Sequence, residues 1–87
     1  MTHETDENRA GARWLAPVWV RVGSGFSEPV RSPAEALEKL THRWPGRRGR
    51  HYLGAKTCCA AALTQQMSAE LAREAFIQAS IESEMLD

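Results

Sequence analysis

The sequence SAELAREAFIQASIESEML, residues 68–86, decides the fold of this chain. Its apolar residues recur at helical spacing, so the stretch predicts one long helix from end to end. They form two stripes. The first stripe contains Leu71, Ala72, Ala75, Phe76, Ala79 and Leu86. The second stripe, on nearly the opposite side, contains Ile77, Ile81 and Met85. A helix with one apolar stripe lies on a core, so a helix with two is either packed on both sides or offers one stripe to a partner.

The second stripe has two explanations that the sequence leaves open. In the first, Ile77, Ile81 and Met85 form a binding surface for a protein partner or for a second copy of the chain. Trp19, on the outer face of a predicted strand, is a candidate addition to that surface. In the second explanation, the N-terminal strands of the same chain cover the stripe.

Length and composition limit the chain to a single small domain. Residues 1–12 of the 87 are polar and predict a disordered tail, which leaves residues 13–87 as the domain. A core of this size is marginal unless its helices pack closely or a second subunit adds buried surface. Lys plus Arg and Asp plus Glu both number 11, so the net charge gives no general signal for nucleic acid or for a membrane.

The sequence also bears on where the protein acts. Its apolar runs are much shorter than the roughly 20 residues that span a bilayer, and its acidic, polar start is unlike a secretory signal. The adjacent cysteines, Cys58 and Cys59, are expected to be reduced, because a disulfide between neighbouring residues is strained. We therefore expect a cytoplasmic protein that is not bound to a membrane.

The first half of the domain predicts a β-hairpin. Residues 16–22, APVWVRV, alternate valine with other residues, which is typical of a half-buried strand. Residues 26–31 form the return strand after a short glycine-containing turn. Pairing Val22 with Phe26 would put Glu28 on the buried face, so we expect a β-bulge or a solvent-facing strand end there.

Three helices follow the hairpin. The first begins with Ser32 as its N-cap and with Glu35 bonding back to the cap, and it runs to about residue 43. The second covers residues 52–66 and is rich in small side chains, and the third is the stretch 68–86. This order predicts an α+β fold, an N-terminal two-stranded antiparallel β-hairpin packed on three α-helices.

Several short motifs occur in a recognisable order. They are SPAEAL at residues 32–37, Trp44-Pro45, A-x2-C-x3-AL at residues 55–63, and AR-x-AFI-x-A at residues 72–79. Over roughly residues 17–86 the chain resembles the family of domains of unknown function numbered nine-eight-two. The resemblance implies a small, stand-alone bacterial protein of the kind found in alphaproteobacteria, and it carries over no catalytic or binding residue. Family members often have a glycine after the AL of the second helix, where this chain has Thr64-Gln65-Gln66.

The segment HRWPGRRGRH, residues 42–51, supports an alternative function, a regulatory domain that binds nucleic acid or another polyanion. The guanidinium group of an arginine can donate two parallel hydrogen bonds to the oxygens of a phosphate. A tryptophan ring can stack on a base. The candidate residues are Arg43, Arg47, Arg48, Arg50 and Trp44. The competing explanation is a solvated basic loop that pairs with the acidic third helix, with Trp44 closing the core.

Catalytic and metal chemistry have little support in the sequence. His42, His51 and the two cysteines supply ligand types, but their spacing matches no zinc pattern. A Cys–His pair that includes His51 has no further residue to support it. We therefore expect no catalytic residue, cofactor or metal, and a small non-enzymatic module that binds a protein or forms a homodimer through its last helix.

Overall fold

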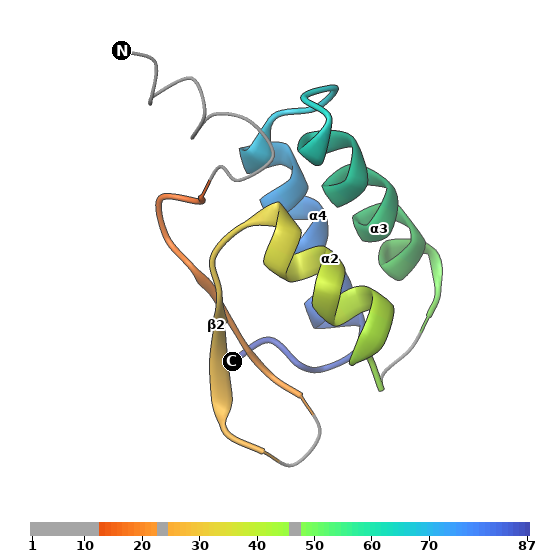
Figure 1. Cartoon of the computed structure of the whole chain (residues 1–87). Coiled ribbons are helices and arrows are strands. Elements are labelled where there is room, and N and C mark those ends of the chain that lie inside the picture. Colours follow the sequence, from red (N-terminus) through yellow and green to blue (C-terminus); the bar gives the residue numbers. More distant parts are fainter. Residues whose placement is uncertain (1–12, 23–24, 46–47) are drawn as a thin grey trace.

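The computed structural model describes residues 13–22, 25–45 and 48–87, so the predicted tail at residues 1–12 lies outside it. The elements are β1 (Val18–Arg21), β2 (Ser27–Val30), α2 (Pro33–His42), α3 (Arg50–Leu63) and α4 (Ala69–Glu82). The α+β order of an antiparallel hairpin followed by three helices is confirmed. In Figure 1, α2 and α3 lie in front of α4, and the hairpin runs along one side of the helices. Within the described ranges, the helices are too short and too polar to cross a membrane.

The hairpin keeps the register that simple counting gives, so of the two alternatives predicted at Glu28, a β-bulge or a solvent-facing strand end, the bulge is wrong, and the Glu28 side chain is 36% exposed. Val20 pairs with Glu28, and the neighbouring pairs continue without interruption on both sides. The Glu28 carboxylate is accommodated because it faces cations of α2. Lys39 Nζ donates to Glu28 Oε1 at 2.8 Å, and Arg43 donates to Glu28 Oε2 at 3.0 Å. Strand β1 is shorter than the predicted strand at residues 16–22, since it begins at Val18 and ends at Arg21.

The start of α2 follows the sequence closely. Ser32 is the N-cap, and its Oγ accepts a hydrogen bond from Glu35 N at 3.2 Å. Glu35 bonds back, but its Oε1 accepts from Arg31 N at 2.9 Å and not from the cap residue. The two bonds fix the angle at which the chain passes from β2 into the helix.

The end of α3 has the hydrogen bonds of a Schellman motif. Gln66 N donates to Ala61 O at 2.8 Å, and Gln65 N donates to Ala62 O at 3.1 Å. Gln65 has a φ of 64°, in the left-handed region that favours glycine. The helix therefore ends at Leu63, earlier than predicted.

The long helix predicted over residues 68–86 also ends early. Met85 N donates to Ser80 O at 2.8 Å, and Glu84 N donates to Ile81 O at 3.0 Å, which is the same motif. Glu84 has a φ of 57°, so the chain turns out of the helix there.

After this turn the chain runs beside β1, along the edge that β2 leaves free. Arg21 N donates to Met85 O at 2.9 Å. Asp87 N donates to Trp19 O, also at 2.9 Å. Figure 1 shows the C-terminus returning to the hairpin in this way. The end of the chain thus closes one edge of the two-stranded sheet.

The core is built around Phe76 of α4. The ring centroids of Trp14 and Trp44 lie 6.0 and 5.7 Å from the Phe76 centroid, and Tyr52 is 6.3 Å from Trp44. All four side chains are buried. Where α3 meets α4, the buried residues are small, which lets the two helices approach closely. These residues are Ala55, Cys59, Ala62, Ala72 and Ala79.

Candidate interaction surface

The three residues predicted as a second stripe do not form one surface. Met85 lies beyond the end of α4 and is only 5% exposed. Ile77 is half-buried and packs against the core, whereas Ile81 is 50% exposed. The prediction failed because it assumed helical geometry past Glu82, where the chain turns inward. Of the two explanations for the second stripe, burial within the same chain therefore holds for Met85 and in part for Ile77.

A different set of α4 residues faces solvent. Leu71 was predicted in the core stripe, but it is 60% exposed. Glu74, Gln78 and Ile81 are exposed as well. The spacing of these residues is three, four and three, so they share one face of the helix, turned away from Phe76. We call Leu71, Glu74, Gln78 and Ile81 the α4 surface.

Two further exposed leucines, Leu15 and Leu86, lie in segments that contact α4 outside the α4 surface. Arg73 Nε donates to Ala16 O at 3.0 Å, which holds the segment of Leu15 against the first half of α4. Leu86 N donates to Ser80 O at 3.3 Å, which holds Leu86 against the last turn. Leu15 is 97% exposed and Leu86 is 42% exposed. The apolar ends of the α4 surface are therefore its own residues Leu71 and Ile81, with Glu74 and Gln78 between them.

Trp19 does not extend the α4 surface. Along β1 it alternates with Val18 and Val20, which are buried against the helices. Successive side chains of a strand point to opposite faces, so Trp19 lies on the face of the hairpin turned away from α4. It is 47% exposed there.

Trp44 is unavailable for stacking on a base. Its ring lies between Phe76 and Tyr52 and is 3% exposed, and its Nε1 donates to Ser83 Oγ at 3.1 Å. The structure therefore gives Trp44 the role of closing the core. This places it outside the candidate nucleic-acid surface.

The arginines near Trp44 make different contacts and do not form one basic surface in the described residues. Arg43 is paired with Glu28. Arg48 donates to Trp44 O at 3.1 Å, and its guanidinium carbon lies 5.3 Å from the centre of the Tyr52 ring. Arg50 is exposed at the start of α3, and Arg47 lies outside the described residues.

The start of α3 could attract an anion, but a carboxylate of α4 already lies there. Glu82 Oε2 accepts from His51 N at 3.4 Å, and Glu82 Oε1 accepts from Tyr52 N at 3.3 Å. Gly49, the N-cap, has no side chain of its own to make these bonds. Glu82 thus satisfies backbone donors that would otherwise suit a phosphate.

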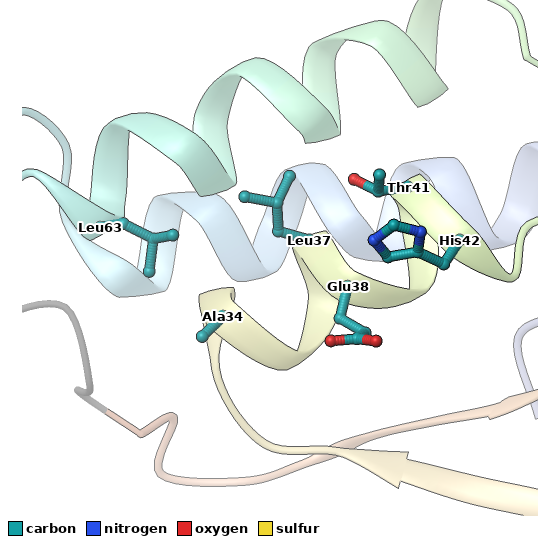
Figure 2. Close-up of a pocket in the computed structure, with 6 residues that line it drawn as sticks. All are labelled: Ala34, Leu37, Glu38, Thr41, His42 and Leu63. Atoms are coloured by element: carbon teal, nitrogen blue, oxygen red, sulfur yellow. The ribbon is translucent and has the colours of Figure 1, made fainter.

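An open groove lies beside α2 (Figure 2). It has a volume of about 270 Å³, close to the lower limit of the roughly 300 Å³ at which small-molecule sites begin. It is lined by Ala34, Leu37, Glu38, Thr41, His42 and Leu63. As Figure 2 shows, the first five of these residues belong to α2, and Leu63 belongs to the end of α3. Among the residues that the structure describes, no hydrogen bond or ion pair joins Glu38 to His42.

The cysteines and histidines show no arrangement for catalysis or metal binding in the described ranges. Burial, with a smaller contribution from Cys58, raises the pKa of the Cys59 thiol to about 12. A thiol with that pKa is a poor nucleophile near neutral pH, because the thiolate is the reactive form. No three His, Cys, Asp or Glu side chains of the described residues lie close enough together to hold a metal ion.

Comparison with known proteins gives a family and no further relative. The family model described as "Protein of unknown function (DUF982)" matches residues 16–86. No curated protein and no solved structure matches the chain. The matched range includes all the helices and strands described above and the whole α4 surface. This chain belongs to the DUF982 family of proteins of unknown function.

Proposed function

We propose that this protein is a small, non-enzymatic interaction module that binds another protein chain through the α4 surface. The observation that carries the proposal is the exposure of two large aliphatic side chains, Leu71 and Ile81, on one face of a helix. A partner that covers this face would remove both apolar groups from water, which favours binding.

The position of α4 supports this function. Its inner side is held by the aromatic core and by the small side chains of α3, and its end is fixed by the turn at Glu84. A surface on such an element loses little conformational freedom when a partner binds, which favours affinity. The polar residues Glu74 and Gln78 between the apolar ends can orient the partner through hydrogen bonds.

Photo-crosslinking inside cells tests the proposal. A photoreactive amino acid at Ile81 should yield a covalent adduct of higher mass on illumination. The matched control is the same substitution at Leu53, a leucine of α3 and not of the α4 surface, which is 59% exposed. Equal yields from the two positions, or an adduct from neither, would refute an interaction through α4.

A further inference from the structure

We draw no further inference here: the strongest candidate, the exposed face of α4 between Leu71 and Ile81, carries nothing beyond the proposed function, because nothing in the part of the chain that the structure describes shows what covers it.

Discussion

Replacing Gln65 by glycine should stabilise the protein. Gln65 follows the last turn of α3 with a φ of 64°, a backbone conformation that side chains disfavour. The conformation is required, because it lets the N–H groups of Gln65 and Gln66 reach carbonyls of the last turn. The Gln65 side chain is exposed and makes no hydrogen bond in the structure, so the substitution removes little else.

The magnitude follows from two opposing terms. A left-handed backbone at a residue other than glycine costs about 1–2 kcal/mol. Glycine avoids this cost, but it lowers the free energy of unfolding by roughly 0.5–1 kcal/mol, since it has more conformational freedom to lose when the chain folds. The midpoints of the two ranges leave a net gain for Gln65→Gly of about 0.75 kcal/mol. For a domain of this length, that corresponds to a rise in Tm of about 3–6 °C.

Thermal unfolding followed by circular dichroism measures this effect. Gln66→Gly is the matched control, because Gln66 is adjacent and exposed but lacks the positive φ. It should leave Tm unchanged or lower it. Glu84→Gly at the end of α4 should raise Tm by a similar amount, since Glu84 has the same strain. The two gains should add, because the sites are independent.

Two results would refute this reasoning. If Gln65→Gly lowered Tm, the left-handed backbone would not be a source of strain at this position. If Gln66→Gly raised Tm as much as Gln65→Gly, the gain would come from general loosening of the loop and not from the positive φ.

Three further predictions concern the core, the hairpin and the thiols. Met85→Ala should lower the free energy of unfolding by about 2–4 kcal/mol in urea titrations, because the side chain is buried, and unchanged stability would contradict its packing. Hydrogen bonds from Lys39 and Arg43 lower the pKa of Glu28 below its ordinary value of 4.5, so the pairing stabilises the fold above that pH and is lost as pH falls through the lowered value. Glu28→Gln should therefore flatten the dependence of Tm on pH below about 4.5, and a parallel curve would count against the pairing. In native protein a maleimide should label Cys58 and spare Cys59, which should react only after unfolding, as mass spectrometry of the digested protein would show.

Much of the fold is encoded locally, so the sequence predicts it. Alternating valines indicate a strand whatever surrounds them, and a hydroxyl before a helix caps it through contacts within a few residues. Ser32 and Ser68 accordingly cap α2 and α4. The resemblance to the family of unknown function also came from short motifs, and the family match confirms it.

The candidate surface was predicted only in outline. The sequence indicated that α4 carries apolar residues on more than one side, and it included Ile81 among those available to a partner. It placed Leu71 inside and Met85 on the helix, because periodicity measures angles around a helix and not what lies against each side. Trp14, the core residue beside the predicted tail, gave no periodic signal at all.

The sequence by itself therefore determined the order of the elements and the capped starts of α2 and α4, since each depends on chemistry between near neighbours. Only the tertiary structure decided where α4 ends and which of its faces meets water. No glycine marks its end in the sequence, and Glu84 takes the strained conformation there. That conformation is held because Met85 is buried and the chain after it pairs with β1, contacts that join opposite ends of the chain. The same turn removes Met85 from the helix. Leu71 and Ile81 are left exposed because the other side of α4, with Phe76, packs on the core.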